Sequence, residues 1–336
     1  MATYTIRRCL QAVVILAGLT VIFFGILNAQ PGGPCAYILA NPKAGADVHA
    51  AYERCIIARG LNKSIPERYW IWLSGVTHGD FGTDFTGRPV IDTLKLRLPA
   101  TLILLGVAYI FQELLALPLG MLGALKRYSL YDHLLTFCSY VGLSLPTFWL
   151  GLMLILLLAI KLSIFPPGGI ITPSFPVSFG TGDYWPWLFS HFGTGIADLF
   201  AHLTLPALTL AIVGIAADSR FMRASMLDAI NQDYVRTARA KGLPRHKVVL
   251  KHTLRNALLP IITNVGLYLG TIVSGAIITE TIFGWPGMGK YFIDALNNQD
   301  SNAMQAVLLL TALTVLLFNL LADLTYAWAD PRIRYD

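Results

Sequence analysis

The sequence predicts an all-α integral membrane protein with six membrane-spanning helices. Hydrophobic residues make up 55% of the 336-residue chain and charged residues only 13%, about half the usual share of a soluble domain. A bilayer core about 30 Å thick needs about 20 apolar residues in a helix, and five stretches of about that length contain no charged residue. This composition excludes a soluble globular domain, a disordered chain and a small disulfide-rich secreted protein.

The gaps between charged residues place the six spans. A sixth apolar stretch contains one charged residue, Glu113, and is otherwise equally apolar. We therefore predict spans near residues 9–29, 99–124, 133–160, 202–222, 257–281 and 305–328. The first apolar run is longer than the 7–15 residues of a typical signal-peptide core, so we expect an uncleaved anchor.

The distribution of Lys and Arg predicts the orientation of the spans. Fifteen of these residues lie in the N-terminal tail, the alternate short loops and the C-terminal tail on one side, against only Lys161 and Lys290 in the short loops on the other. Positive charges in short loops stay in the cytoplasm. We therefore expect both termini to be cytoplasmic in a multi-pass protein. The net charge of +6 then belongs to the inner membrane surface, and no nucleic-acid partner is expected.

The spans divide the chain into three parts. Residues 1–29 form an N-terminal tail and the first span, residues 30–98 a large outer loop domain, and residues 99–336 a five-helix core that includes an inner loop at 223–256. In the outer domain, "HGDFGTDFTGRP" (78–89) is typical of a loop with short turns. Cys35 and Cys55 lie in this domain, outside the membrane, where disulfides persist, so we predict a Cys35–Cys55 disulfide.

The apparent catalytic motifs are weak. "GWPGMGK" (284–290) has the spacing of a phosphate-binding loop, but Tyr291 replaces the magnesium-binding hydroxyl and the segment is expected outside. Ser144 has no predicted base to activate it, and with Pro146 nearby it is better placed to bond backbone groups freed at a helix break. His246 and His252 are six residues apart, which does not place two ligands on one helix face. We predict no catalytic, cofactor or metal site.

Three ionisable residues within or near the spans are candidates for a translocation pathway: Glu113, Asp218 and Arg220. Charged residues in membrane helices are costly and usually functional. The alternative interpretation is structural. Glu113 would then be neutral and hydrogen-bonded within the bundle, while Asp218 and Arg220 reach water at the inner interface.

The inner loop carries the most specific signal. The segment "DYVRTARAKGLPRHKVVLKHTLRNALLP" (233–260) is basic, and its two helical halves are divided by Gly242, Leu243 and Pro244. We expect two short helices around a turn, with Gly242 at positive φ or at a close approach. A basic loop that binds lipid headgroups explains the charges, but it explains neither Gly242 nor the apolar positions.

This segment resembles the cytoplasmic "EAA" loop of ABC importer permeases, in the version found in peptide transporters. "DYVRTARAKGL" (233–243) and "LRNALLP" (254–260) match that version, and "GDFGTDF" (79–85), "RLPATL" (97–102), "LSLPTFWLGL" (143–152) and "ETIFGWPGMGK" (280–290) extend the resemblance along nearly the whole chain. The similarity is greatest to the B-type permease subunit of dipeptide and oligopeptide importers. In this chain Arg236, Thr237 and Ala238 replace the Glu-Ala-Ala triplet, whereas Gly242 is kept.

The resemblance implies a type I ABC importer permease in a bacterial or archaeal cell membrane. The implied partners are a second, C-type permease, two cytoplasmic ATP-binding subunits, an extracytoplasmic substrate-binding protein and membrane lipid. ATP and magnesium would be bound by the ATPase subunits, and this chain would hold no cofactor. The residues implied to enter a groove on an ATPase subunit are Tyr234, Arg236, Ala238, Arg239, Ala240, Lys241, Gly242 and Leu243. The outer domain would cap the pathway or receive the binding protein.

Other functions remain as alternatives. Within the family, the same machinery imports nickel, glutathione or haem instead of peptides. A secondary transporter would need inverted repeats or paired broken helices, and a membrane enzyme would need convergent reactive groups in the spans; the sequence shows neither.

Overall fold

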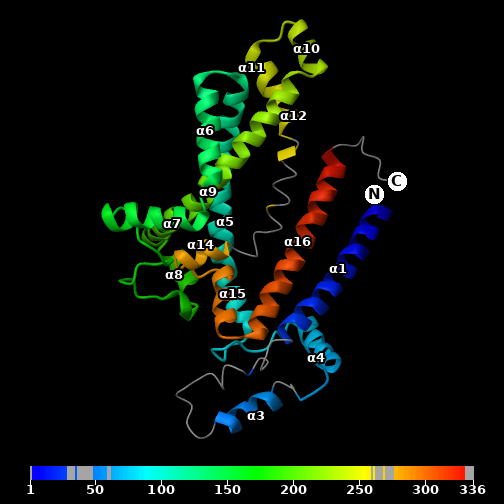
Figure 1. Cartoon of the computed structure of the whole chain (residues 1–336), viewed down its shortest axis with the longest axis vertical. Helices are drawn as coiled ribbons and strands as arrows, with labels where there is room; N and C mark the ends of the chain where they lie inside the picture. Colours follow the sequence, from blue (N-terminus) through cyan, green and yellow to red (C-terminus); the bar gives the residue numbers. More distant parts are fainter. Residues whose placement is uncertain are drawn as a thin grey trace. The chain divides into compact units, whose positions relative to one another are not determined.

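The structure is a computed structural model that describes residues 2–28, 35, 48–58, 62–258, 260–261, 268 and 276–329. Over these residues the chain is helical, and its extended backbone pairing is limited to one isolated bridge between Thr83 and Pro89 (Figure 1). The predicted all-α membrane architecture is confirmed.

The chain divides into two compact units, which are described separately. Unit 1 comprises residues 1–101, 273–277 and 287–336, and unit 2 comprises residues 102–272 and 278–286. The helices of unit 1 are α1 (Ala2–Asn28), α3 (Val48–Ala58), α4 (Ile65–Thr77), α15 (Met288–Asn297) and α16 (Ser301–Ala329). The 36-residue helix α5 (Val90–Leu125) begins in unit 1 and continues into unit 2.

The remaining elements belong wholly or mainly to unit 2. They are α6 (Leu130–Ser144), α7 (Thr147–Leu154), the π-helix η2 (Ile155–Lys161), the 3₁₀-helix η3 (Phe179–Thr181), α8 (Tyr184–Ser190), α9 (Phe192–Ile230), α10 (Asp233–Ala240), α11 (Arg245–Lys247), the π-helix η4 (Val248–Thr253), α12 (Leu254–Ala257) and α14 (Ile277–Ile282).

Four helices of the described residues are long and apolar enough to cross a membrane by themselves: α1, α5, α9 and α16. They contain the spans predicted near 9–29, 99–124, 202–222 and 305–328. The span predicted near 257–281 lies mostly outside the described residues.

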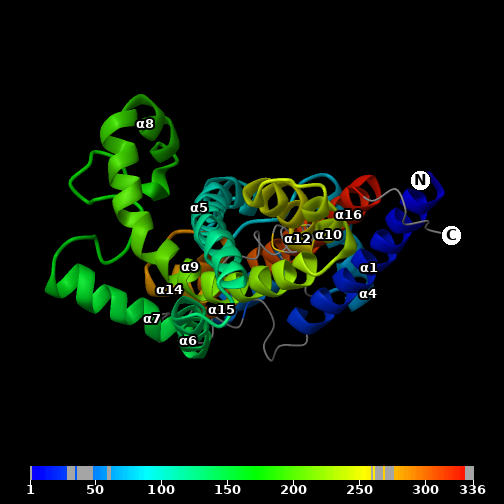
Figure 2. The ribbon, with the colours of Figure 1, turned by 90° about the horizontal axis from the view of Figure 1, so that it is seen from above.

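The remaining predicted span, 133–160, is a bent pair instead of one continuous helix. The α6 segment and the α7–η2 segment are bent by 98°, and α7 points away from α6 in both views (Figures 1 and 2). Leu145 is extended at φ −79° and ψ 122°, because the ring of Pro146 disfavours helical backbone at the preceding residue. The hydroxyl of Ser144 donates to the backbone oxygen of Tyr140 at 2.8 Å, one turn back in α6.

Unit 1 is built on the antiparallel pair α1 and α16, which lie side by side (Figure 1). The beginning of α1 and the end of α16 therefore lie at the same end of the pair. Toward the opposite end, the hydroxyl of Thr20 on α1 and the hydroxyl of Tyr69 on α4 form a hydrogen bond of 2.9 Å. A buried cluster that includes Leu27, Met304 and Tyr291 joins α1, α15 and α16.

Unit 2 is built on close packing of α5, α6 and α9. A Cβ on Gly120 of α5 would collide with the backbone oxygen of Ser219 on α9, so glycine lets these two helices approach. A Cβ on Gly142 of α6 would lie 2.9 Å from the Cβ of Ala216 on α9. Small residues at such crossings are a common basis of helix association in membranes.

Helix α9 is longer than one membrane crossing requires. Its 39 residues correspond to about 58 Å of helix at 1.5 Å per residue, nearly twice the roughly 30 Å of a bilayer core. Its last turns carry Arg220, Arg223 and Asp228. Pro206 lies inside this helix, and the chain from α10 to α12 follows shortly after its last residue, Ile230.

Candidate functional site

The segment from α10 to α12, which we call the knob, folds as two helical arms around a glycine turn. Gly242 has φ +71°, a conformation that L-residues with a side chain rarely adopt. Its N–H donates to Arg239 O at 2.9 Å, and the N–H of Leu243 donates to Ala238 O at 3.4 Å. Pro244 then starts α11. The predicted turn at positive φ is confirmed.

A small apolar core holds the two arms together. Val235 and Ala238 of α10 pack with Val248 of η4, and all three side chains are buried. Ala238 therefore lies inside the knob, although the resemblance implied that it contacts an ATPase. Its small side chain allows the two arms to approach each other.

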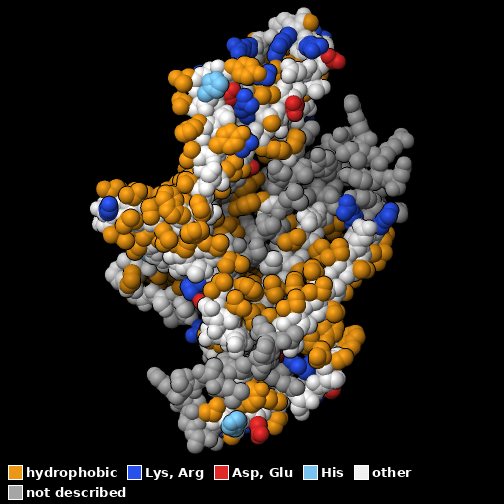
Figure 3. All heavy atoms as spheres, viewed as in Figure 1, with side chains coloured by type: hydrophobic (Ala, Val, Ile, Leu, Met, Phe, Trp, Pro, Cys, Tyr) orange, Lys and Arg blue, Asp and Glu red, His pale blue; other side chains and the backbone are white. Residues whose placement is uncertain are grey.

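The other implied coupling residues are on the knob surface: Tyr234, Arg236, Arg239, Ala240, Lys241, Gly242 and Leu243 are exposed. Tyr234 is 39% exposed, Leu243 37% and Leu250 53%, so the knob presents apolar side chains among its charged ones. Figure 3 shows Lys and Arg side chains gathered over this end of unit 2. Apolar side chains within a basic surface suit a protein partner with an apolar groove and acidic residues at its rim.

The knob is anchored rigidly to the end of α9. Met222, Met226 and Ala229 of α9 form a buried cluster with Ala257 of α12 and Ile261. Force applied to the knob would therefore reach α9 through packed side chains.

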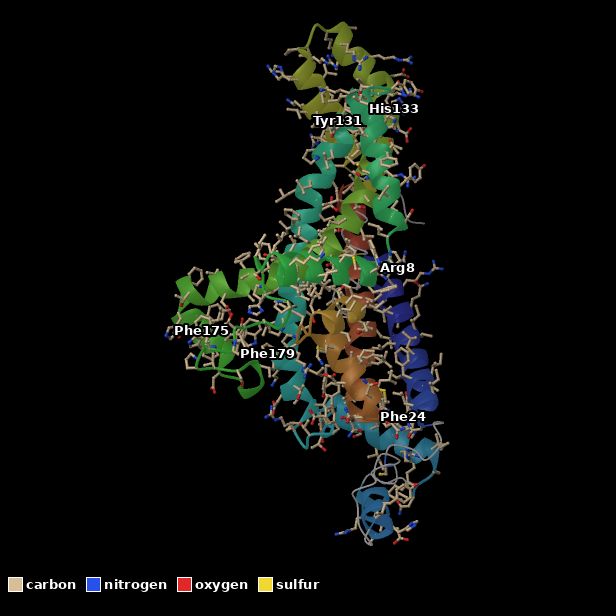
Figure 4. The ribbon with its side chains drawn as sticks, turned by 60° about the vertical axis from the view of Figure 1, so that its left-hand side comes forward. Arg8, Phe24, Tyr131, His133, Phe175 and Phe179 are labelled. Carbon is tan, nitrogen blue, oxygen red and sulfur yellow. The ribbon has the colours of Figure 1, made fainter. Side chains whose placement is uncertain are left out.

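An ion pair that was not predicted from the sequence joins the C-terminal part of α9 to the start of α6. Arg223 donates from Nε to Asp132 Oδ1 at 2.5 Å and from its terminal nitrogen to Oδ2 at 2.8 Å, and the backbone N–H of Tyr128 donates to Oδ2 at 2.9 Å. Asp132 lies at the start of α6, between Tyr131 and His133, which are labelled in Figure 4. A paired geometry of this kind holds α6 and α9 in register.

The structure brings together two of the three predicted pathway residues. The side-chain amide of Gln112 donates to Asp218 Oδ2 and, at 3.5 Å, to Glu113 Oε1. A Cβ on Gly214 would collide with the Gln112 side chain, so this glycine makes room for the polar cluster. Sequence reasoning missed both Gln112 and Gly214.

Arg220 is separate from this cluster. Its guanidinium lies over the ring of Tyr140 on α6, 4.4 Å from the ring centroid. Next to the polar cluster, Tyr109 and Tyr268 stack with ring centroids 4.1 Å apart. Among the described residues, no group of three or more His, Cys, Asp or Glu side chains is placed to hold a metal ion.

In unit 1, the loop at 79–89 forms a dense polar network around Asp84. The carboxylate accepts hydrogen bonds from the N–H and hydroxyl of Thr86, the N–H of Arg88 and the hydroxyls of Thr93 and Tyr291. Burial raises the pKa of the Asp84 carboxyl, but the hydrogen bonds from Thr86, Arg88 and Thr93 outweigh burial and hold this pKa below its usual value. The network makes the predicted loop a rigid element.

The same loop is fastened to the start of α16. Asp300 accepts a hydrogen bond from the N–H of Phe85 at 2.6 Å and from the N–H groups of Asn302 and Ala303. Asn302 in turn donates to Thr83 O at 3.0 Å. Asp300 therefore caps the helix and holds the loop with the same carboxylate.

The cysteines are described in part. Cys35 is buried and disulfide-bonded, whereas Cys9 and Cys138 are free and exposed. The side chain of Cys55 lies outside the described residues, so the Cys35–Cys55 pairing stays a prediction.

Two family models match the chain. Residues 116–335 match the family described as "Binding-protein-dependent transport system inner membrane component". Residues 1–105 match the model described as "Binding-prot-dependent transport system membrane comp, N-term". Together they cover the chain except residues 106–115 and residue 336.

Full-length relatives are similar over the whole chain. The oligopeptide transport system permease protein AppB of Bacillus subtilis (strain 168) is 41% identical, and 100% of each chain is covered. The dipeptide transport system permease protein DppB of Escherichia coli (strain K12) is 38% identical, with 100% of this chain and 99% of the relative covered. The di/tripeptide transport system permease protein DppB of Pseudomonas aeruginosa (strain UCBPP-PA14) is 36% identical with the same coverage.

Proposed function

Because the chain belongs to the family of binding-protein-dependent transport system inner membrane components, we propose that it is a transmembrane subunit of an ATP-driven importer of di- or oligopeptides. The observation that carries this proposal is full-length similarity to three permeases named for oligopeptides, dipeptides and di/tripeptides. These names favour peptides over nickel, glutathione or haem.

The subunit would work in a complex and would hydrolyse nothing by itself. Its partners would be a second permease, two ATP-binding subunits that hold ATP and magnesium, and an extracytoplasmic binding protein that delivers the peptide. The substrate would pass between the two permeases. In this arrangement both termini and the knob lie in the cytoplasm, where ATP is available.

The knob would transmit movement of an ATPase subunit to the membrane. Closure of the ATPases on ATP would pull on the surface formed by Tyr234, Arg236, Lys241 and Leu243. The buried cluster at Met226 and Ala257 would pass that movement to α9, and the Arg223–Asp132 ion pair would make α6 follow. The polar cluster of Glu113, Gln112 and Asp218 is placed on the moving helix α9 and on α5. This cluster would be exposed to the substrate pathway or covered from it as the helices rotate.

Uptake by the reconstituted complex tests the proposal. Proteoliposomes containing the complete complex should transport a labelled dipeptide only when two conditions are met. ATP must be present on the side of the membrane that carries the ATPase subunits, and the binding protein must be present on the other side. Gly242→Asp adds a charge at the turn of the knob, and it should sharply reduce both uptake and transport-stimulated ATP hydrolysis. Uptake that does not require ATP would support a secondary transporter instead. Accumulation of nickel, glutathione or haem in place of dipeptide would reject the peptide assignment.

A further inference from the structure

Unit 1 contains a pocket of about 710 Å³ whose walls come from α1, Ile57 of α3, Lys63, α4, the 80–89 loop and α16. Its volume is in the range of small-molecule sites. The α4 wall is formed by Arg68, Ile71, Trp72 and Gly75, whose i, i+3, i+4 and i+7 spacing makes one face of the helix.

The other walls are formed in the same way. Phe24 and Asn28 are one turn apart at the end of α1, and Ser301, Asn302 and Gln305 lie in the first turns of α16. Phe24 packs edge-on against Tyr69 with ring centroids 5.5 Å apart, and Figure 4 shows it on the part of α1 near α4. The pocket is therefore a built feature of packed helices.

The polar groups of the pocket are incompletely satisfied. Ser301 is 4% exposed, and its hydroxyl has no hydrogen-bond partner among the described residues. Leaving a buried hydroxyl unpaired costs free energy, so its position in the pocket wall points to a ligand that the hydroxyl can bond.

The pocket also holds a cation without a carboxylate partner. Arg68 donates one hydrogen bond to Asn28 Oδ1, and no salt bridge to it is found within the described part of the chain. Burial lowers the pKa of its guanidinium. Asp80, the acidic residue among those that line the pocket, accepts a hydrogen bond from the N–H of Gly82 at 2.8 Å. The remaining N–H groups of Arg68 are suited to an anion, which they would hold in a forked geometry.

The position and lining of the pocket favour an amphipathic anion over a small soluble one. Two of its walls are ends of membrane-spanning helices, which lie at the level of the lipid headgroups. Its apolar lining includes Phe24, Trp72 and Phe81. Trp70 is 67% exposed on α4, as expected for a helix at the membrane interface, where Trp is enriched.

We propose that this pocket binds the headgroup of an anionic phospholipid. The phosphate accepts hydrogen bonds from Arg68, and a headgroup or ester oxygen accepts a hydrogen bond from the hydroxyl of Ser301. The apolar part of the lipid lies against Phe24 and Trp72 and leaves along the exposed side of α1, where Ile26 is 62% exposed. The bound lipid would fasten α4 to the two spans.

Native mass spectrometry of the purified complete complex, titrated with dioleoyl phosphatidylglycerol after delipidation, tests this site. Arg68→Gln should weaken the tightest lipid-binding step about tenfold, the usual effect of losing a charge-assisted hydrogen bond. Ser301→Ala should weaken it by a few-fold without lowering the thermal stability of the lipid-free complex, because it removes an unpartnered hydroxyl. Arg54→Gln on α3 is the matched control: Arg54 is exposed and does not line the pocket, so lipid binding should not change.

Competition identifies the source of the anion. Zwitterionic phosphatidylcholine should bind more weakly than phosphatidylglycerol, and millimolar inorganic phosphate should not displace the lipid. Equal lipid binding by wild type, Arg68→Gln and Ser301→Ala would overturn the proposal. Displacement by inorganic phosphate would overturn the lipid assignment in favour of a soluble anion, and displacement by a dipeptide would assign the pocket to cargo.

Discussion

The loop at 79–89 and the knob both turn at glycines with positive φ. The key polar groups of the loop are bonded within the protein, whereas those of the knob are exposed on its surface. In the loop, the carboxylates of Asp84 and Asp300 are surrounded by hydrogen-bond donors of the chain itself. In the knob, the charged side chains point outward, and its two arms share a small core of Val235, Ala238 and Val248. The loop is built to hold its own shape, whereas the knob is built to present a surface.

The two glycine turns show the same difference. A Cβ on Gly82 of the loop would lie 2.7 Å from the Asn302 side chain, whereas no heavy atom of the described residues lies within 4 Å of the Cβ position at Gly242. Gly82 is required by its surroundings as well as by its backbone angle. Around Gly242 the space is open, and an ATPase subunit is the proposed occupant. Substitutions in the loop should therefore cost stability, and substitutions in the knob should cost coupling.

The largest loss of stability should come from Asp84→Ala. It leaves the donors of Thr86, Arg88 and Thr93 without their acceptor in a largely buried site, at a cost of about 3 kcal/mol. Thermal unfolding of the purified complex, with assembly followed by size-exclusion chromatography, measures the effect. Asp80→Ala is the matched control, because Asp80 is exposed and, among the described residues, its side chain accepts one hydrogen bond, from the N–H of Gly82. Equal stability of the two variants would show that the Asp84 network is not structural.

Gly82→Ala should lower the stability of the protein more than Gly87→Ala does, by a smaller amount than Asp84→Ala costs. Both glycines have positive φ, +75° and +82°, so each substitution introduces backbone strain of about 1–2 kcal/mol. Only Gly82→Ala also displaces Asn302 and its hydrogen bond to Thr83, which should add about 1 kcal/mol. The difference between the two unfolding temperatures isolates the close approach. If Gly87→Ala were equally destabilising, backbone strain alone would explain both losses.

The pH dependence of stability should change when Asp84 is made neutral. Because the pKa of Asp84 is lower in the folded state, its ionised form stabilises the protein above the unfolded pKa of about 4. That contribution is lost as pH falls through the folded pKa. The wild type should lose stability between about pH 5 and pH 3, and Asp84→Asn should lose less over the same interval. Parallel pH curves for the two proteins would contradict this assignment.

The smallest effect on stability should come from Gly242→Asn. Asn tolerates the left-handed backbone region better than most residues, and the space around Gly242 is open. The free energy of unfolding should therefore change by less than about 1 kcal/mol. ATP-driven uptake should nevertheless fall severalfold, because the new side chain occupies the docking surface. Gly87→Asn tests the same backbone region in the loop and should leave uptake unchanged. Normal uptake by Gly242→Asn would weaken the distinction between the two regions.

The sequence predicts features that depend on local pattern. Hydropathy locates the four separate spans, and the Gly242-Leu243-Pro244 break locates the turn of the knob. The burial of Ala238 could also have been predicted, since Val235 and Ala238 are three residues apart and share a helix face.

Long-range pairs were not predictable from one sequence. Asp132 and Arg223 are separated by 91 positions, and Phe85 and Asp300 by 215, so no local spacing marks them as partners. The bend of 98° between α6 and α7 has a local signal in Pro146. Its size depends on how α7 packs against α9, which the sequence pattern does not contain.

Site-specific photocrosslinking from the knob tests the central claim most directly. A photoreactive residue replacing Leu243, which is exposed at the turn, would be activated in the complete membrane-embedded complex. Leu130, an exposed residue at the start of α6, would serve as the control position. We predict an ATPase adduct from position 243 whose yield changes when ATP is trapped, and no such adduct from position 130. Crosslinks from position 243 to lipid alone would contradict the account and would make the knob a membrane-binding loop.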